Sequence, residues 1–217
     1  MNLKSYNRIK NELGSDICLV AVSKGQPLEK ILELYNLGHR DFGENFLQEM
    51  LEKKAQLPDD IKWHFLGNIQ SNKLSKILDS SYLIHSVSRQ KIYKLLVNSK
   101  PKDSIRILLQ LKLGIEETKS GFSENEILSI VKNHNKGSKI KIKGVMAISE
   151  NNISNTELIA QFEYAGKLFK NLQLIDNEIE ILSMGMSNDY KEALSFNTNM
   201  IRLGTIIFGK RNLNNER

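Results

Sequence analysis

The stretch ICLVAVSKGQPLEKILELYNLG, residues 17–38, contains one complete strand-to-helix unit. Residues 17–23 form a short apolar run with high β propensity, which is typical of a buried strand. After Pro27, leucine and isoleucine recur at helical spacing, and Gly38 ends the pattern, as expected for an α-helix. A strand followed so closely by a helix favours a parallel α/β fold.

The same alternation continues along the chain, after an N-terminal helix over about 1–13. The sequence predicts eight strands, at 17–23, 41–43, 61–67, 82–87, 105–113, 140–148, 178–185 and 200–208. It predicts helices between them at 27–38, 46–56, 71–78, 89–98, 123–134, 155–172 and 189–195, the fifth of these beginning with a capping box of Ser123 and Glu126. Eight units of about 25 residues predict a single (β/α)8 TIM barrel over residues 1–217, with a polar tail at 210–217. An open, doubly wound sheet is the alternative that strand counting alone does not separate from the barrel.

Composition excludes several classes of protein. One cysteine, Cys18, permits no internal disulfide and no site built from several cysteines. The four histidines show no shared metal-ligand spacing, so we predict hydrogen-bonded or surface roles for them and no metal site. We expect Cys18 to be a small buried side chain and Trp63 to belong to the core.

Charge and hydropathy point to a protein that is free in solution. The net charge of +6 comes without a basic run, so we predict no nucleic-acid partner. The apolar stretch at 105–113 is interrupted by Arg106 and Lys112 and is too short to span a membrane. The N-terminus is polar and lacks the apolar segment of a signal peptide. We therefore expect a cytoplasmic protein, and a monomer, because no exposed apolar stripe is evident.

Polar, glycine-rich and methionine-rich features follow the predicted strands. In parallel α/β folds, functional residues gather at the carboxyl ends of the strands. The features found at those ends are Lys24, Glu44, Asn45, the segment 67–73, the segment 119–121, Met146, the segment 183–190 and the segment 202–205. The sequence indicates no comparable pattern at the amino ends. The carboxyl end of the barrel is therefore the expected site.

Lys24 is the first candidate residue of that site. Its parity with Cys18, Val20 and Val22 places it on the same face of the first strand. If that face lines the barrel, the ammonium group must pair with an anion or lose its proton. A desolvated lysine is a nucleophile for carbonyl groups and forms a Schiff base. A lysine that simply emerges into solvent at a strand end remains the alternative interpretation.

Two loops suggest a phosphate site. Ser187 lies in a Gly–Ser–Asn loop before a helix, and Gly204 with Thr205 forms a second turn that carries a hydroxyl. Barrels of this class often bind phosphate in the loops after strands seven and eight. For each loop alone an ordinary helix cap is the favoured interpretation, but the presence of both at the expected strands favours phosphate binding.

Seven segments in order carry a resemblance to a known family. They are LVAVSK (19–24), FGEN (42–45), WHFLGNIQSNK (63–73), KSG (119–121), GVMAI (144–148), LSMGMSNDY (182–190) and IRLGTIIFG (201–209). Together they resemble the pyridoxal phosphate homeostasis protein family over nearly the whole chain. The resemblance implies a barrel similar to the N-terminal domain of alanine racemase, with pyridoxal 5′-phosphate (PLP) as its cofactor.

The resemblance also implies roles for individual residues. Lys24 matches the family's Schiff-base lysine, Arg202 the arginine that faces the pyridine nitrogen, and Asn45 a residue that lines the cofactor. The phosphate-binding residues of the family match Ser187, Gly204 and Thr205. The sequence departs from the family at Gly25 and Asn68, neither of which matches a cofactor ligand.

The residues favour a cofactor carrier over a catalyst. PLP enzymes rely on the ring as an electron sink, and this works best when the pyridine nitrogen is protonated. Arg202 is a permanently charged donor, so we expect an unprotonated nitrogen and a weaker sink. Eight units use the chain up to Gly209, and we expect no second domain to supply an opposing base for racemisation. The predicted role is PLP homeostasis with no catalytic residue and with apo-PLP enzymes as recipients; the alternative is a weak racemase or decarboxylase that uses a tyrosine or His64.

Overall fold

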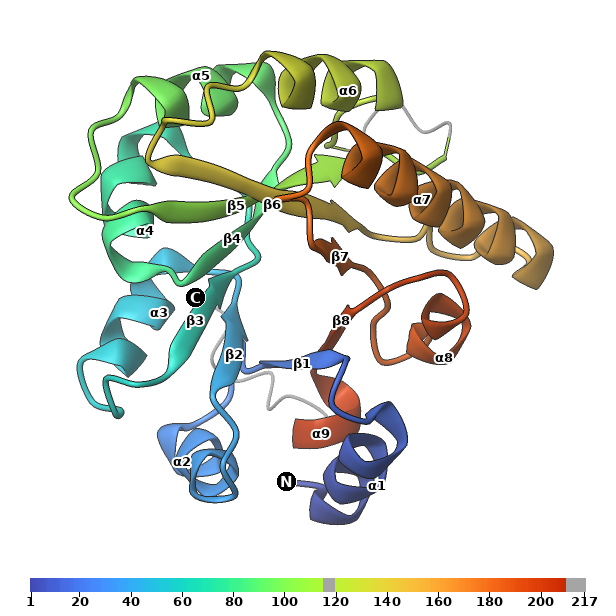
Figure 1. The fold of residues 1–217 in the computed structure, drawn as a ribbon. Helices are drawn as coiled ribbons and strands as arrows, with labels where there is room; N and C mark the ends of the chain where they lie inside the picture. Colours follow the sequence, from blue (N-terminus) through green and yellow to red (C-terminus); the bar gives the residue numbers. More distant parts are fainter. Residues whose placement is uncertain (115–119, 210–217) are drawn as a thin grey trace.

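Eight parallel strands close into a barrel in the computed structural model, which describes residues 1–114 and 120–209 (Figure 1). The strands are β1 (Cys18–Val22), β2 (Asp41–Glu44), β3 (Lys62–Phe65), β4 (Leu83–Val87), β5 (Ile105–Leu111), β6 (Ile140–Ala147), β7 (Ile181–Ser183) and β8 (Met200–Leu203). They pair in chain order, and β1 pairs with both β2 and β8. The predicted TIM barrel is therefore confirmed, and the open sheet is wrong. The predicted tail at 210–217 lies outside the described residues.

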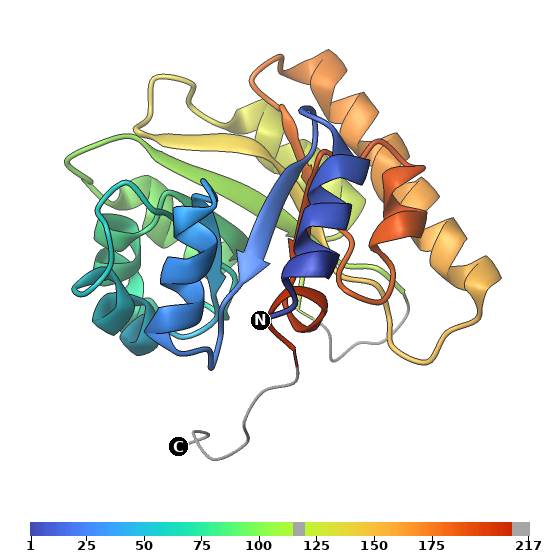
Figure 2. The same ribbon diagram turned by 90° about the horizontal axis from the view of Figure 1, so that it is seen from below.

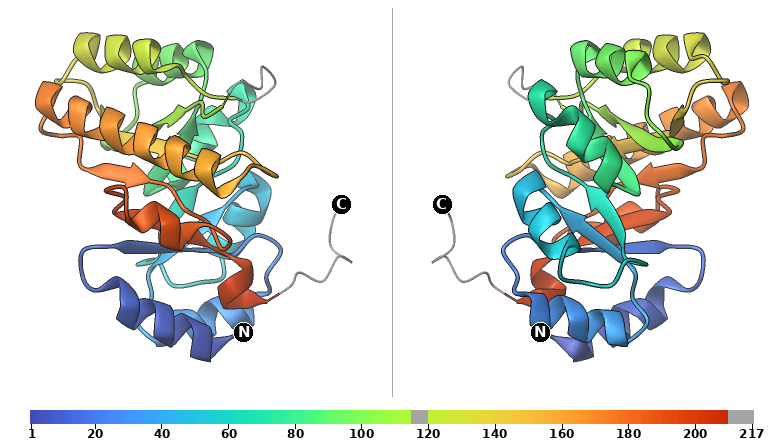
Figure 3. Two further views of the ribbon diagram at one scale, coloured as in Figure 1. Left: turned by 90° about the vertical axis from the view of Figure 1, so that its right-hand side faces the viewer. Right: turned by 90° about the vertical axis from the view of Figure 1, so that its left-hand side faces the viewer.

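Helices surround the barrel on its outer side (Figures 1 and 3). They are α1 (Leu3–Leu13), α2 (Leu28–Asn36), α3 (Leu47–Lys54), α4 (Leu74–Ser80), α5 (Gln90–Asn98), α6 (Glu124–Asn133), α7 (Asn155–Ile175), α8 (Tyr190–Leu194) and α9 (Thr205–Phe208). The extra N-terminal helix α1 lies beside α9 (Figure 2), and the Asn2 N–H donates to the Ile207 carbonyl at 2.7 Å. None of the described helices is long and apolar enough to cross a membrane.

The two faces of β1 enter different hydrophobic clusters. Val20 belongs to the cluster inside the barrel, where it packs with side chains of β4, β5, β6 and β8. Leu19 and Ala21 point the other way and join the larger core beneath the helices. Cys18 packs against the same interior cluster as Val20, as alternation along the strand requires, and Lys24 follows in the turn after β1. The predicted inward parity of the first strand is confirmed.

Two helices begin with capping boxes. The Ser123 hydroxyl accepts from the backbone N–H of Glu126, whose carboxylate accepts in return from the Ser123 N–H at 2.8 Å. The predicted box of α6 is therefore confirmed. Ser154 and Glu157 repeat the arrangement at the start of α7, the longest described helix, which runs along one side of the barrel (Figure 3).

The end of the chain differs from the prediction. The sequence predicts a strand over 200–208, but β8 ends at Leu203 and the helical turn α9 follows. The Ile207 and Phe208 N–H groups both donate to the Gly204 carbonyl, at 3.0 and 2.9 Å. A short apolar run does not by itself distinguish a strand from a buried helical turn, which explains the error.

Candidate active site at the carboxyl end of the barrel

Lys24 lies two residues beyond the carboxyl end of β1 and begins the turn that leads to α2. Its side chain is half buried, and Nζ lies 4.6 Å from the centroid of the Phe46 ring. Among the described residues, Nζ has no hydrogen bond and no ion pair. In the register of β1 and β8, Val20 pairs with Arg202, so Lys24 lies nearer the carboxyl rim than Arg202 does. Within residues 1–114 and 120–209, the lysine amine at the mouth of the barrel has no polar partner.

A buried ion cluster holds the loop on both sides of this lysine. The Ser23 hydroxyl donates to Glu44 Oε1 at 2.6 Å, and the Gly25 N–H donates to Glu49 Oε1 at 2.6 Å. Lys53 Nζ donates to both carboxylates at 2.7 Å, and also to the Ser23 carbonyl at 2.7 Å. The cluster therefore joins β2 and α3 to the end of β1, and it fixes the backbone that carries the amine.

Glu44 is the most deeply buried member of this cluster, with no exposed side-chain surface. Burial raises its pKa from 4.5 to about 7; Lys53 opposes the rise, and Glu49 adds to it. Sequence analysis placed Glu44 at a strand end but assigned it no partner. The spacing of Glu49 and Lys53, four residues apart on one helix, was the available signal for the cluster.

Asn45 brings a third loop into the site. It is half buried and directly follows β2. A Cβ placed on Gly67, in the loop after β3, would lie 1.7 Å from the Asn45 carbonyl oxygen. The two backbones therefore touch, and only glycine fits at position 67. This contact fixes the position of the Asn45 backbone at the rim.

Arg202 is a buried cation below the rim. Its side chain projects from β8; Nη1 donates to Ser183 Oγ at 2.7 Å, and Nη2 donates to the Ala147 carbonyl at 2.9 Å. Burial lowers its pKa from 12.5 to about 10, while Asp189 opposes this effect, so the guanidinium stays charged at neutral pH. Two of its five N–H donors are engaged by the described residues, and the others remain for a ligand.

The two predicted phosphate loops meet each other. Ser187, in the loop after β7, is half buried, and its Oγ accepts from the backbone N–H of Gly204 at 3.3 Å. Thr205 follows Gly204 at the first position of α9 and is exposed. Hydroxyl and amide donors from β7 and β8 thus gather at one place on the rim. The structure brings these three predicted residues together.

Asp189 shapes the loop that carries Ser187. Its carboxylate accepts from the Met186 N–H at 2.6 Å and from the Ser149 hydroxyl, beyond β6, at 2.5 Å. The Arg202 N–H donates to the Gly185 carbonyl at 3.0 Å and ties the same loop to β8. Sequence analysis did not identify Asp189 as a loop anchor, because its partners Met186 and Ser149 lie in two different loops.

Several other predictions have different outcomes. Trp63 lies in the core as predicted, whereas Cys18 is only half buried and packs at the edge of the interior cluster. Lys119, of the KSG segment, lies outside the described residues. Within the described residues, no group of three or more His, Cys, Asp or Glu side chains is placed to hold a metal ion.

The amino end of the barrel is more polar than the sequence indicated. A cavity of about 770 Å³ opens there and is lined in part by Lys10, Arg40, Asp41, Lys62 and Cys18. The expectation of no polar pattern at the amino ends is therefore wrong. The charged residues there come from β2, β3, helix α1 and a connecting loop, so no single sequence segment contains them.

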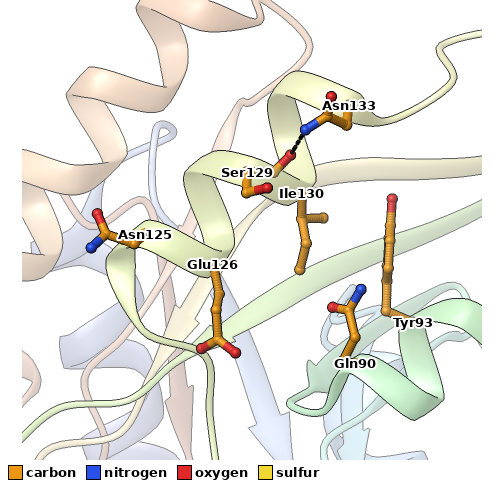
Figure 4. Close-up of a pocket in the computed structure, with 7 residues that line it drawn as sticks. All are labelled: Gln90, Tyr93, Asn125, Glu126, Ser129, Ile130 and Asn133. Atoms are coloured by element: carbon orange, nitrogen blue, oxygen red, sulfur yellow. Dashed lines mark hydrogen bonds between the residues drawn. The ribbon is translucent and has the colours of Figure 1, made fainter.

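A separate hollow lies on the outside of the barrel, between α5 and α6 (Figure 4). It measures about 450 Å³, and the residues that line it include Gln90, Tyr93, Glu126 and Ser129. Its lining residues belong to the helices α5 and α6 and not to the strand ends that form the candidate site. We therefore exclude it from that site.

Comparison with known proteins matches nearly the whole chain. The family described as "Alanine racemase, N-terminal domain" matches residues 3–212. The pyridoxal phosphate homeostasis protein of Schizosaccharomyces pombe is 37% identical over 209 residues, covering 91% of this chain and 86% of the relative. The protein of the same name in Escherichia coli K12 is 32% identical, covering 90% of this chain and 86% of the relative.

Solved structures give the same result. PipY of Synechococcus elongatus, with PLP bound, aligns with a TM-score of 0.87 at 31% identity, covering 96% of this chain and all of PipY. Alanine racemase of Corynebacterium glutamicum aligns with a TM-score of 0.78 at 15% identity, covering 95% of this chain and 60% of the racemase. The second likeness shows a common fold.

Proposed function

Because the chain belongs to the alanine racemase N-terminal domain family, and within it to the pyridoxal phosphate homeostasis proteins, we propose that it binds PLP at the carboxyl end of its barrel. One observation carries the proposal. An unpaired lysine amine, a buried guanidinium with unengaged donors and a turn lined with hydroxyl and amide donors all meet at one end of the barrel.

The chemistry of these groups fits the cofactor. PLP presents an aldehyde, a pyridine nitrogen and a phosphate dianion, and each has a complementary group here. Lys24 would hold the aldehyde end of the cofactor as a Schiff base, with loss of water. Arg202 would donate to the ring nitrogen, and Asn45 would line the cofactor.

The phosphate is assigned to the place where the loop after β7 meets the turn after β8. Ser187 and Thr205 supply hydroxyl donors, and Gly204 has no side chain to obstruct the approach of an anion. The Gly204 N–H donates to Ser187 Oγ at 3.3 Å, and we assign this backbone donor to the phosphate as well. The loop anchor Asp189 stays engaged with Ser149 and Met186 and holds Ser187 in place.

The proposed role is PLP homeostasis and supply without catalysis. A permanently charged arginine at the ring nitrogen keeps that nitrogen unprotonated and weakens the ring as an electron sink. His64 does not supply a base at the rim, because it is fully buried inside the barrel with both ring nitrogens in hydrogen bonds. Tyr190 begins α8 directly after the β7 loop, and its side chain is buried near charges of α1 and α8.

The direct test is spectroscopic. Protein supplied with PLP should absorb visible light, and borohydride should fix the cofactor on the peptide that contains Lys24. Lys24→Ala should abolish both signals. A colourless protein that stays unlabelled refutes the proposal, and turnover of an amino acid that is lost with Lys24→Ala supports the racemase or decarboxylase alternative.

A second measurement tests the phosphate assignment. Ser187→Ala combined with Thr205→Ala should weaken PLP binding at least tenfold, since two donors to a charged oxygen are lost. Cys18→Ala, at the opposite end of the barrel, is the matched control and should bind as the wild type does. Unchanged affinity in the double variant refutes the assignment.

The cellular role extends the same proposal. We expect a cytoplasmic monomer that delivers PLP to apo-enzymes. Sedimentation of the purified protein tests the monomeric state. Activation of a PLP-depleted enzyme by the loaded protein tests the delivery of PLP. Activation no faster than with free PLP released into the buffer contradicts direct delivery.

A further inference from the structure

A row of polar side chains crosses the inside of the barrel, where an apolar core is the usual filling. Asp41, His64, His85, Ser183 and Arg202 project inward from β2, β3, β4, β7 and β8. His64, His85 and Ser183 are fully buried. Asp41 stands at the amino end, where it lines the cavity of about 770 Å³, and Arg202 stands below the opposite rim. The row therefore connects the two ends of the barrel.

Each neighbouring pair in this row is within hydrogen-bond distance. Asp41 Oδ1 lies 3.0 Å from His64 Nε2, and His64 Nδ1 lies 2.9 Å from His85 Nε2. His85 Nδ1 lies 3.1 Å from Ser183 Oγ, which accepts from Arg202 Nη1 at 2.7 Å. The row of hydrogen bonds is therefore continuous from the Asp41 carboxylate to the Arg202 guanidinium.

With both imidazoles neutral, the two ends of the row give every hydrogen bond one direction. Arg202 only donates, so Ser183 Oγ accepts from it; the serine keeps one proton, which it donates to the lone pair of His85 Nδ1. His85 then carries its proton on Nε2 and donates to His64 Nδ1. His64 likewise carries its proton on Nε2 and donates to Asp41, whose carboxylate only accepts. Both imidazoles are neutral and share one tautomer.

The opposite direction leaves a group unpaired. If both histidines carried protons on Nδ1, the Ser183 hydroxyl would accept from His85 and Arg202 at once, and its own proton would have no acceptor in the chain. The His64 Nε2 lone pair would also face the Asp41 carboxylate. Burial lowers the pKa of both histidines, which agrees with neutral rings.

From this geometry we propose that Asp41, His64, His85 and Ser183 are positioning residues for Arg202. Asp41 locks both tautomers from the amino end, and the locked chain presents a Ser183 lone pair to the guanidinium. Together with the Ala147 carbonyl, this contact holds Arg202 in one orientation below the rim. The inference rests on the proposed function in one respect: the oriented guanidinium is the group assigned to the cofactor's ring nitrogen.

The first experiment needs no cofactor. In full-length protein labelled with ¹⁵N, NMR correlations of the imidazole rings should show His64 and His85 protonated on Nε2. Asp41→Asn keeps the shape of the side chain but adds an amide donor, and a comparable substitution in a catalytic triad traps the wrong tautomer. We expect both rings to move their proton to Nδ1 and the Arg202 side-chain N–H signals to broaden. Asp60 is an exposed aspartate that does not belong to the row, so Asp60→Asn should change neither the histidine tautomers nor the Arg202 signals.

The second experiment uses PLP. Asp41→Asn should bind it about tenfold more weakly and shift its visible absorbance band, because the guanidinium has lost a fixed acceptor. Asp41→Glu, which keeps a carboxylate acceptor, should restore the tautomers and most of the affinity. A merely structural role for Asp41 would change stability without shifting the absorbance band.

The outcomes separate the inference from the proposed function. If wild-type histidines carry protons on Nδ1, or if Asp41→Asn leaves them unchanged, the inference is overturned. It is also overturned if the tautomers switch while PLP affinity and absorbance stay the same. If the wild type binds no PLP at all, the proposed function fails, while the tautomers and the Arg202 signals still report on the chain. Should Asp41→Asn not fold, Ser183→Ala breaks the link next to Arg202 and must weaken PLP binding in the same way.

Discussion

Glu44 provides a quantitative test of how the barrel holds its rim lysine. The substitution Glu44→Gln keeps the size of the side chain and an oxygen that accepts from Ser23 and Lys53, but it removes the titration. Glu44 Oε2 has no hydrogen-bond partner in the described structure, so the proton of the neutral acid has an unoccupied oxygen to sit on. The pH dependence of the unfolding free energy should therefore differ between the wild type and the variant over the pH range in which Glu44 ionises.

The expected magnitude follows from the raised pKa. The folded protein binds the Glu44 proton more tightly than the unfolded chain, because the pKa rises from 4.5 to about 7. The resulting stabilisation is complete below the unfolded pKa and is lost as the pH rises through the folded pKa. At about 1.4 kcal/mol per pKa unit, the loss amounts to about 3 kcal/mol at pH 8, of which about 1 kcal/mol has appeared by pH 5. The stability difference between wild type and Glu44→Gln should thus change by about 2 kcal/mol between these pH values, in favour of the wild type at pH 5.

Urea denaturation of both proteins at pH 5, 6, 7 and 8 measures this difference. His39 and His64 titrate in the opposite sense, since burial lowers their pKa values, but they are present in both proteins and cancel. A difference in unfolding free energy that stays constant across the pH range would refute the reasoning. Such a result would mean that Lys53 keeps Glu44 ionised despite its burial.

Three further substitutions test the packing. Gly67→Ala should destabilise the protein by about 3 kcal/mol and weaken PLP binding, because its Cβ would lie 1.7 Å from the Asn45 carbonyl oxygen. Urea denaturation measures the first effect and a PLP titration the second. A variant as stable as the wild type contradicts the contact. Gly144→Ala should cost a similar amount, since its φ is +152° and its Cβ would lie 1.8 Å from the Ile181 carbonyl; wild-type stability in denaturation would disprove the close approach of β6 and β7. Ser154→Ala should cost about 1 kcal/mol through the lost cap of α7, and an unchanged midpoint in urea would show that packing alone holds that helix end.

The barrel was predictable because its signals are local. Each strand and each following helix is encoded within about 25 residues, and the inward facing of Val20 follows from alternation along one short strand. The meeting of Ser187 and Gly204 was predictable for the same reason, since both lie in loops whose place is fixed by chain order. The resemblance to a family added roles to these residues, and the geometry at the rim is consistent with them.

The ion cluster behind Lys24 was less accessible to sequence analysis. Glu49 and Lys53 form a visible pair on one helix, but Glu44 comes from a strand, and its outward direction depends on how β2 is aligned in the barrel. An acidic residue at the end of a strand near a proposed site suggests a ligand contact. In the structure, Glu44 instead faces α3, where it accepts hydrogen bonds from the Ser23 hydroxyl and from Lys53.

The interior chain shows where prediction from one sequence ends. Asp41, His64, His85, Ser183 and Arg202 lie on five strands, so no sequence spacing links them. Parity alone assigns each to the inside, yet contact also requires equal height along the barrel axis, and that height is set by strand register. The register pairs Gly43 with His64 and places Ser183 beside Met200, two residues from Arg202, whereas a shift of one residue in β3 would turn His64 outward to the helices. From sequence alone, His64 and His85 could equally be surface residues. Only the closed barrel shows that both are buried members of the hydrogen-bonded row.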